Sequence, residues 1–232
     1  MSGLLRVESL YKSFTTKFVK TNALIDVNLT INSGDFAVIT GPSGGGKSTL
    51  LSILSLLQES DSGSYFLRDK DISQLSLDEK AKLRNKEFGI IFQSFNLVGD
   101  LTVAQNVALP LRYSRSINKS QYLKNVTESL ERVGLESRAN HLPAQLSGGQ
   151  QQRVAIARAL STSPSIIFAD EPTGNLDTKN RDTVLNLLSE LNSSGVTICL
   201  VTHDTSVTDL ATKNFQIIDG NVSKSSEMRL KL

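Results

Sequence analysis

The sequence predicts an α/β fold with a mainly parallel central sheet. Three runs, at 36–40, 166–169 and 196–201, are almost continuously apolar, as strands covered on both faces are. Between the last two runs, apolar residues within 184–191 recur at the i, i+3, i+4, i+7 spacing of a helix, which Gly195 is expected to end. A strand, a crossover helix and a second strand form the unit from which parallel sheets are built.

Two further strands are predicted from different patterns. Residues 24–31 alternate between apolar and polar side chains, which indicates a strand with one face in water, as is common in antiparallel sheets. Residues 215–218 indicate another strand, which enters a tight turn at 219–221 before Val222.

The middle of the chain is predicted to be helical. From about 101 to 160 helical patterns dominate, and no buried strand is indicated. One helix is expected to be capped by Ser120 and to stop at Gly134. Its buried stripe is predicted to consist of Leu123, Val126, Leu130 and Val133.

The composition excludes several classes of function. The chain has 232 residues with a formal net charge of +2, and no run of Lys or Arg suggests an arm that binds nucleic acid. No secretory signal and no apolar stretch of transmembrane length is present, so the chain is expected in the cytosol. The only cysteine, Cys199, lies in an apolar run and is interpreted as a core residue, which leaves no disulfide or cysteine metal site.

The first chemical motif follows the run 36–40. It reads Gly41-Pro42-Ser43-Gly44-Gly45-Gly46-Lys47-Ser48 and fits G-x-x-x-x-G-K-[ST], with the apolar segment 50–57 after it. Glycines are needed because successive N–H groups must converge on phosphate oxygens without a Cβ in the way. We expect Lys47 to contact the β- and γ-phosphates of a nucleotide and the Ser48 hydroxyl to ligate Mg²⁺.

A second motif narrows the choice among kinases, GTPases and ATPases. The segment 146–150 reads LSGGQ and precedes a small apolar helix. Ser147 and Gln150 have the spacing of a capping box, which places the amides of Gly148 and Gly149 at an exposed helix N-terminus, a second anion site. The alternative is a well-capped core helix, although such a helix needs no paired glycines after its cap.

Candidate catalytic groups follow two of the buried runs. Asp170 and Glu171 end the run 166–169, and their side chains should point to different places because side chains on a strand alternate. Asp170 then suits the Mg²⁺ shell and Glu171 the attacking water, unless the pair is a solvated turn. His203 follows the run 196–201, at the sheet edge where open α/β folds bind ligands, although a lone histidine in a loop can also be structural.

In this order, the motifs strongly resemble those of the nucleotide-binding subunits of ABC transporters, from about Leu5 to Val222. The resemblance implies a P-loop NTPase fold: an α/β fold with a mainly parallel core sheet, an N-terminal antiparallel β subdomain and a helical signature subdomain. It also implies a single domain over 1–232, divided into a catalytic core at 1–92 and 161–225, a helical subdomain at 93–160 and a tail at 226–232.

The resemblance implies a role for each site residue. Gln93, which would otherwise be taken for a surface residue, would be the Q-loop glutamine and would join Ser48 and Asp170 at Mg²⁺. Phe14 would stack on adenine, although Tyr11 is a nearby alternative and Phe14 could instead pack in an edge strand. The residues implied to bind ATP are Phe14, Gly41, Pro42, Ser43, Gly44, Gly45, Gly46, Lys47, Ser48, Thr49, Gln93, Ser147, Gly148, Gly149, Gln150, Asp170 and Asp177. Those implied to be catalytic are Lys47, Gln93, Glu171 and the switch histidine His203.

Three segments indicate a branch of the family. FGIIFQSFNL, LTVAQNVALPLRY and ADEPTGNLD are most similar to those of lipoprotein-release, macrolide-export and cell-division ABC systems. The resemblance implies an ATPase that works as a head-to-tail homodimer with ATP between the copies, on the cytoplasmic face of the inner membrane. Its partner would be a separate integral membrane permease.

The resemblance leaves one departure and some alternatives. Gly45 stands where the family usually has Ser, so the loop is expected to be more flexible. A soluble ABC ATPase that acts on nucleic acid, a cell-division regulator and a non-catalytic cassette are the other readings. A kinase would leave 147–150 without a purpose.

Overall fold

The computed structural model describes residues 3–114 and 118–224, so the predicted tail at 226–232 lies outside the described residues. Sheet A is antiparallel with the order β2-β1-β4-β5 and consists of β1 (Leu5–Thr15), β2 (Lys20–Ile31), β4 (Ser62–Leu67) and β5 (Lys70–Asp71). Sheet B has the order β10-β9-β3-β8-β7-β6 and consists of β3 (Phe36–Thr40), β6 (Phe88–Ile91), β7 (Ile166–Asp170), β8 (Thr197–Thr202), β9 (Lys213–Ile218) and β10 (Asn221–Lys224).

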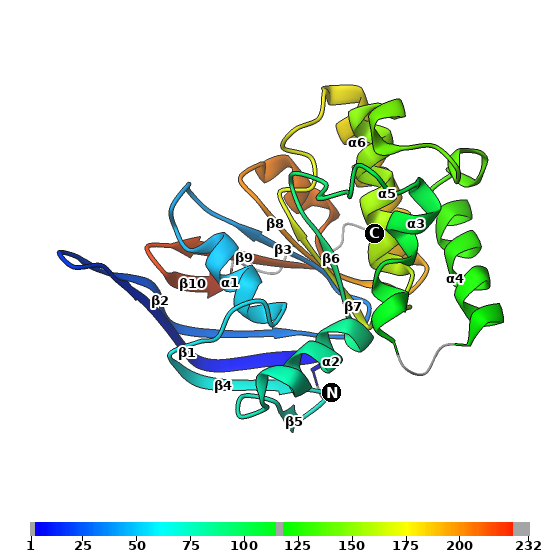
Figure 1. The fold of residues 1–232 in the computed structure, drawn as a ribbon. Helices are drawn as coiled ribbons and strands as arrows, with labels where there is room; N and C mark the ends of the chain where they lie inside the picture. The colour runs from blue at the N-terminus through cyan, green and yellow to red at the C-terminus, as the bar shows by residue number, and fades with distance from the viewer. Residues whose placement is uncertain (1–2, 115–117, 225–232) are drawn as a thin grey trace.

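Helices cover sheet B on both faces (Figure 1). The α-helices are α1 (Lys47–Leu54), α2 (Leu77–Glu87), α3 (Val103–Ala108), α4 (Lys119–Arg132), α5 (Gly148–Leu160) and α6 (Thr178–Ser193). Short 3₁₀ helices lie at Pro110–Tyr113, Glu136–Arg138, Pro143–Gln145 and Thr205–Leu210. Among the described residues, no helix combines the length and apolar character needed to cross a bilayer.

Alternating residues of sheet B divide the core into two parts. Ala37 and Ile39 of β3 pack in a cluster with α1 and the inner face of sheet A. Val38, between them, belongs to a second cluster with α3, α4, α5 and α6. This alternation follows from the period of a strand, and it places α1 and α5 on opposite faces of the same sheet.

The predicted α/β fold is confirmed. β3, β7 and β8 are parallel neighbours, and α6 connects β7 to β8. The helix stops before Gly195, whose φ of 98° is the left-handed conformation expected after a helix C-terminus. The predicted turn after 215–218 is a two-residue connection at Asp219 and Gly220, both with positive φ, and it makes β10 antiparallel to β9.

Two expectations for the helical region are wrong. The fourth α-helix is capped by Asn118, whose side chain accepts from the Gln121 amide at 2.9 Å, and Ser120 lies within its first turn. Leu123 is 59% exposed. Tyr122, one position earlier, packs on the core because its spacing to the buried Val126 is four residues.

The edge strand β6 lies directly on α5. A Cβ placed on Gly89 would lie 2.6 Å from the Ala159 carbonyl oxygen, so only glycine fits without a shift of the strand or the helix. This contact fixes the strand that leads to Gln93 against the helix that begins at the LSGGQ segment.

We expect Gly89→Ala to lower the free energy of unfolding by about 1–3 kcal/mol, because an added methyl group would press on backbone atoms of α5. Gly99→Ala is the matched control, since a Cβ there meets nothing within 4 Å. Urea unfolding of both variants measures the difference. Equal stabilities would contradict the close packing of β6 on α5.

Candidate functional site

The loop 41–46 connects β3 to α1 at the carboxyl edge of sheet B. Gly46 caps α1 with a φ of 103°, and a Cβ on it would lie 2.4 Å from the Ala23 carbonyl oxygen. Gly44 also has a left-handed φ, of 78°. The close approach to Ala23 requires glycine at position 46, and the left-handed φ favours glycine at position 44. Such a backbone can form an anion nest.

Lys47 is the cation of this loop. Its side chain is buried, and Nζ donates to the carbonyl oxygens of Gly41 at 2.9 Å and Pro42 at 3.0 Å. The loop therefore holds the ammonium group within its own curve, where it could meet the terminal phosphates of a nucleotide.

A cavity of about 410 Å³ adjoins the loop. Phe14 forms part of its wall and is 43% exposed, whereas Tyr11 does not line it. The structure therefore favours Phe14 as the aromatic of this site. The cavity is lined by Phe14, Thr21, Asn22, Ala23, Gly44, Gly46, Lys47, Ser48, Thr49, Asp219 and Gly220.

Five of these lining residues were not predicted: Thr21, Asn22, Ala23, Asp219 and Gly220. The turn at Gly220 reaches the site because its amide donates to Gly45 O at 3.1 Å and its carbonyl accepts from Ile25 N at 2.8 Å. The sequence shows this turn but contains no signal of its contact with the loop.

The strand that carries Phe14 is held by Asp61. This carboxylate accepts from Lys12 Nζ at 2.8 Å, from Ser13 N at 2.7 Å and from Ser13 Oγ at 2.9 Å. The bond from Lys12, followed by those from Ser13, lowers the pKa of Asp61 to about 2. The ionised form is thus favoured by folding.

We expect Asp61→Asn to lower stability at neutral pH by less than about 1 kcal/mol, since the carboxylate is largely exposed. A lowered folded-state pKa stabilises the chain above the unfolded pKa, near 4, and this contribution is lost as the pH falls toward about 2. Thermal melts across that range should show the variant and the wild type converging. Asp100→Asn, in another exposed loop, is the control, and a difference that grew toward acid would contradict the assignment.

Asp170 is the last residue of β7 and faces the phosphate loop. Ser48 Oγ donates to its Oδ1 at 3.3 Å. Burial, together with the charge of Glu171, raises the pKa of Asp170 despite the Ser48 bond and the charge of Lys47. A partly buried carboxylate with little compensation is suited to a cation.

The Ser48 hydroxyl and the Asp170 carboxylate are oxygen ligands of the kind that Mg²⁺ takes from a protein. Among the described residues, no group of three or more His, Cys, Asp and Glu could hold a metal ion. A divalent cation beside Ser48 and Asp170 would take its remaining ligands from phosphates and water, which is the arrangement that Mg²⁺ favours.

The direction of the Glu171 side chain is set by an unusual backbone conformation and not by the strand alternation expected from the sequence. It lies just past β7 with a left-handed φ of 45°, so the backbone itself redirects the side chain. Such a conformation is costly for a residue with a Cβ and is found where the surroundings enforce it. Here the Glu171 amide donates to Val201 O at 2.9 Å.

The Glu171 carboxylate has two side-chain partners from the end of β8. His203 Nδ1 lies 2.8 Å from Oε1, and Thr202 Oγ1 donates to Oε2 at 3.2 Å. The carboxylate is 14% exposed and the imidazole 67% exposed. Glu171 is therefore fixed while His203 reaches toward solvent; Thr202 was not predicted, although it directly precedes His203 in the sequence.

The predicted capping box at the start of α5 is confirmed. Ser147 Oγ accepts from Gln150 N at 3.3 Å, and Gln150 Oε1 accepts from Ser147 N at 2.9 Å. Gly149 packs on α6, because a Cβ there would lie 2.2 Å from Asn180 Oδ1. None of the residues 146–150 is among those that line the 410 Å³ cavity.

Gln93 and Asp177 are the two remaining predicted residues. Asp177 lies in the segment between β7 and α6, and Gln93 lies next to that segment. The Gln93 side chain contacts Gly174, whose added Cβ would lie 2.7 Å from Gln93 Nε2, and Gln93 O accepts from Asn175 Nδ2 at 3.0 Å. Asp177 caps α6 by accepting from Asn180 N at 2.9 Å. Neither lines the 410 Å³ cavity.

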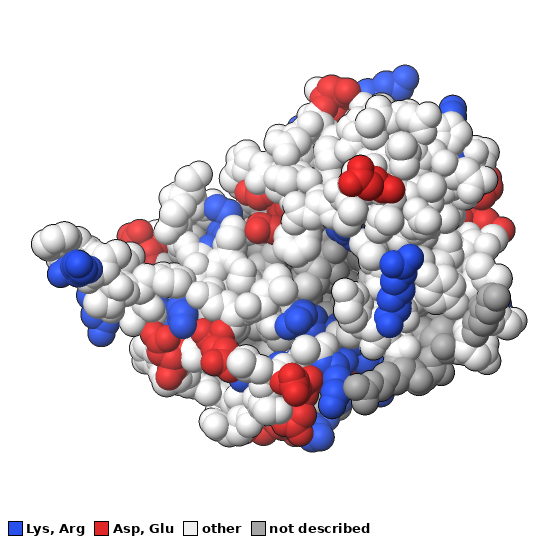
Figure 2. Space-filling model, viewed as in Figure 1, with Lys and Arg blue, Asp and Glu red and all other residues white. Residues whose placement is uncertain are grey.

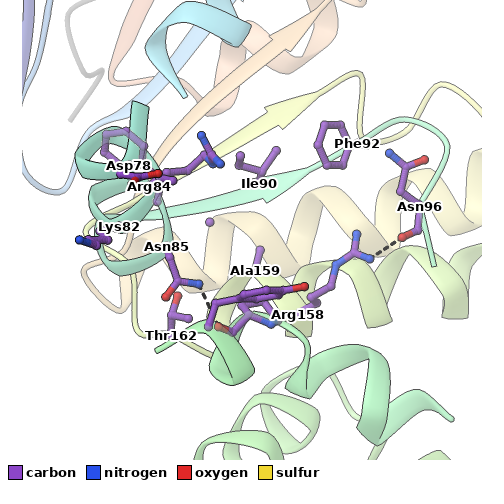
Figure 3. Close-up of a pocket in the computed structure, with 15 residues that line it drawn as sticks. Asp78, Lys82, Arg84, Asn85, Ile90, Phe92, Asn96, Arg158, Ala159 and Thr162 are labelled. Carbon is purple, nitrogen blue, oxygen red and sulfur yellow. Dashed lines mark hydrogen bonds between the residues drawn. The ribbon is translucent and has the colours of Figure 1, made fainter. Parts of the chain in front are cut away.

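A groove of about 680 Å³ lies between α2, β6 and the end of α5 (Figure 3). Lys82, Arg84 and Arg158 line it, and Asp78 is its one acidic residue. Asn85 of α2 donates to Pro110 O at 2.9 Å and so joins its two walls. Sequence patterns gave no indication of this groove, because its walls come from segments far apart in the chain.

The groove continues into a second cavity of about 720 Å³ that Arg68, Lys82 and Lys86 line together with Glu87. Figure 2 shows Lys and Arg side chains over α2 on this face. The combined lining carries more positive than negative side chains.

Comparisons with known proteins agree with these motifs. A family model described as "ABC transporter" matches residues 24–174. The uncharacterized ABC transporter ATP-binding protein MJ1508 of Methanocaldococcus jannaschii is 46% identical, over 94% of this chain and 97% of its own. The macrolide export ATP-binding/permease protein MacB of Chlorobaculum tepidum is 44% identical over 94% of this chain. This chain covers only 33% of the MacB sequence.

Solved structures agree with the fold. A dimeric post-hydrolysis state of the ATP-binding cassette MJ0796, bound to ADP and Pi, superposes with a TM-score of 0.87 at 39% identity. The match covers 97% of this chain and 99% of that one.

Proposed function

We propose that this chain, which belongs to the ABC transporter family of ATP-binding proteins, binds and hydrolyses ATP between two of its own copies. Hydrolysis would drive a separate membrane protein in export, lipoprotein release or mechanical signalling. The position of the LSGGQ segment carries the proposal. It lies outside the cavity of its own chain, on the helix that covers the opposite face of sheet B from α1.

A second copy of the chain can supply the LSGGQ segment that is missing from each cavity. In a head-to-tail dimer, the amides of Gly148 and Gly149 and the hydroxyl of Ser147 would face the γ-phosphate held by the other copy. Asp177, at the start of α6, would lie at the same interface. The dimeric MJ0796 cassette with ADP and Pi supports this arrangement.

Within one chain, the base and the phosphates of the nucleotide each have a matching group. Phe14 would stack on adenine, the amides of 41–46 would surround the phosphates, and Lys47 would leave the loop carbonyls for the β- and γ-oxygens. Ser43, within the loop, and Thr49, in the first turn of α1, would add hydroxyl contacts.

Ser48, Asp170 and Gln93 would hold Mg²⁺ with the phosphate oxygens. When bound, the ion neutralises charge on the β- and γ-phosphates. Glu171, fixed by its contacts, would accept the proton of the attacking water. His203 would donate to the γ-phosphate as negative charge develops there.

The groove beside α2 is the proposed docking site of the membrane partner. It adjoins the strand that leads to Gln93, so a segment seated in it would be close to a nucleotide-sensing residue. The MacB relatives, of which this chain matches a third, are named ATP-binding/permease proteins, which supports a permease partner. The chain would then lie on the cytoplasmic face of the membrane.

The direct test is phosphate release by the purified chain with ATP, with and without Mg²⁺, alone and with co-purified membrane protein. We expect turnover that EDTA abolishes and that the membrane partner raises. Absence of turnover in both preparations would contradict the proposal, and stimulation by DNA or RNA in place of the membrane partner would favour a nucleic-acid ATPase.

We expect Phe14→Ala to raise the KM for ATP about tenfold, because stacking of a base on an aromatic ring contributes about 1–3 kcal/mol. Tyr11→Ala is the matched control, since Tyr11 is exposed on the same strand but does not line the cavity. The KM for GTP should change in the same way, because stacking does not depend on the base. A larger effect of Tyr11→Ala would reassign the adenine contact.

A further inference from the structure

The helix α5 lies close to residues 89–96, the segment that contains Gln93, at three places. At its carboxyl end, Gly89 of β6 lies against Ala159. At its amino end, the ring of Phe95 lies 3.9 Å from where a Cβ of Gly148 would be. The third point is Arg158, which reaches from α5 to the turn that follows Gln93 (Figure 3).

Arg158 binds two consecutive carbonyl groups of this turn. Its Nη2 donates to Phe95 O at 2.8 Å, and its Nη1 donates to Asn96 O. A guanidinium group can do this because its donors form a rigid planar fork. A lysine has a single nitrogen at the end of a flexible chain and cannot reproduce the fork.

The turn needs such a partner because its backbone is unusual. Phe95 and Asn96 both have left-handed φ values, of 59° and 50°. Two successive residues with Cβ atoms in this region are costly unless the surroundings hold them. The fork of Arg158 satisfies the two carbonyl groups that this conformation directs toward α5.

Arg158 also faces the proposed docking groove. Its side chain is one of the groove's walls, together with Phe92 and Asn96. Among the described residues, no ion pair joins Arg158 to a carboxylate. The positively charged guanidinium group of Arg158 therefore interacts with the turn and faces the groove.

We propose that Arg158 is a positioning residue that ties the Gln93 turn to the LSGGQ helix, so that the groove, Gln93 and Ser147 move as one unit. This inference rests on the proposed function. A segment of the membrane partner in the groove would displace the turn, and Arg158 would pass that displacement along α5 to the face that meets the second copy.

The test compares Arg158→Lys with Arg153→Lys. Arg153 lies on the same helix and also donates to a backbone carbonyl, that of Val133 at 2.9 Å, but it does not line the groove. We expect Arg158→Lys to lower kcat and the ATP-dependent formation of dimers about tenfold, as for the loss of one charge-assisted hydrogen bond. The KM for ATP should stay within about twofold, because the residues around the 410 Å³ cavity are unchanged.

Amide hydrogen exchange separates this inference from the proposed function, since it needs no turnover. In the nucleotide-free chain, Arg158→Lys should speed exchange at 94–97 and at 148–151, whereas Arg153→Lys should leave both segments as in the wild type. The inference is overturned if exchange at 94–97 is unchanged in Arg158→Lys, or if the wild type hydrolyses ATP and the two variants have equal kcat. A wild type that exchanges as expected but does not hydrolyse ATP would count against the proposed function alone.

Discussion

Glu171→Gln is expected to lower the rate of ATP hydrolysis by about 10²–10⁴, the usual contribution of a general base. Glutamine has the same shape, and its amide oxygen can still accept from Thr202 Oγ1, so the fold of the site is expected to survive. ATP should therefore bind with an unchanged Kd. Only the proton acceptor for the attacking water is removed.

Single-turnover hydrolysis and equilibrium binding of ATP measure the two effects separately. Glu128→Gln serves as control, because Glu128 is exposed on α4 and pairs only with Lys124 among the contacts of the described residues. Wild-type turnover in Glu171→Gln would remove Glu171 from its proposed role. A parallel loss of ATP binding would show that the substitution disturbs the site itself.

His203→Ala should lower kcat by about 10²–10³, the typical effect of removing one preorganised contact to a transition state. The imidazole is more exposed than the carboxylate it contacts, which leaves it free to reach a phosphate at the end of sheet B. Since the charge on that phosphate grows during the reaction, the loss should fall on kcat more than on KM.

His141→Ala is the natural control, since His141 is the only other histidine and its ring contacts Arg138. Steady-state kinetics of both variants at saturating Mg²⁺ decide the assignment. A His203→Ala enzyme within a few-fold of the wild type would identify His203 as a structural partner of Glu171.

The apolar runs of β3, β7 and β8 predicted the centre of sheet B because strands buried on both faces have few polar positions. β6 escaped prediction since it has only four residues, one of them glycine, directly after the polar helix α2. The error at Leu123 has a different cause, the choice of the buried face of a helix. A stripe on a helix is ambiguous by one position until its tertiary partner is known.

The sequence predicted those parts of the site whose backbone conformation is determined by neighbouring residues in the chain. The glycine loop at 41–46 and the capping box of Ser147 are local, and both have the geometry that their sequences indicate. The left-handed backbone of Glu171, the contact of the Gly220 turn with the phosphate loop and the fork of Arg158 depend on contacts between distant segments. No local pattern could have revealed them.

The molar mass of Glu171→Gln in solution with ATP tests the composite site most directly. Light scattering during gel filtration should give about twice the 25.3 kDa of one chain with ATP and a single chain without it. Adding Ser147→Arg to the same variant should return it to a monomer that still binds ATP, because the phosphate loop is intact. A strictly monomeric Glu171→Gln at saturating ATP, alone and with membrane protein, would contradict a site shared between two copies.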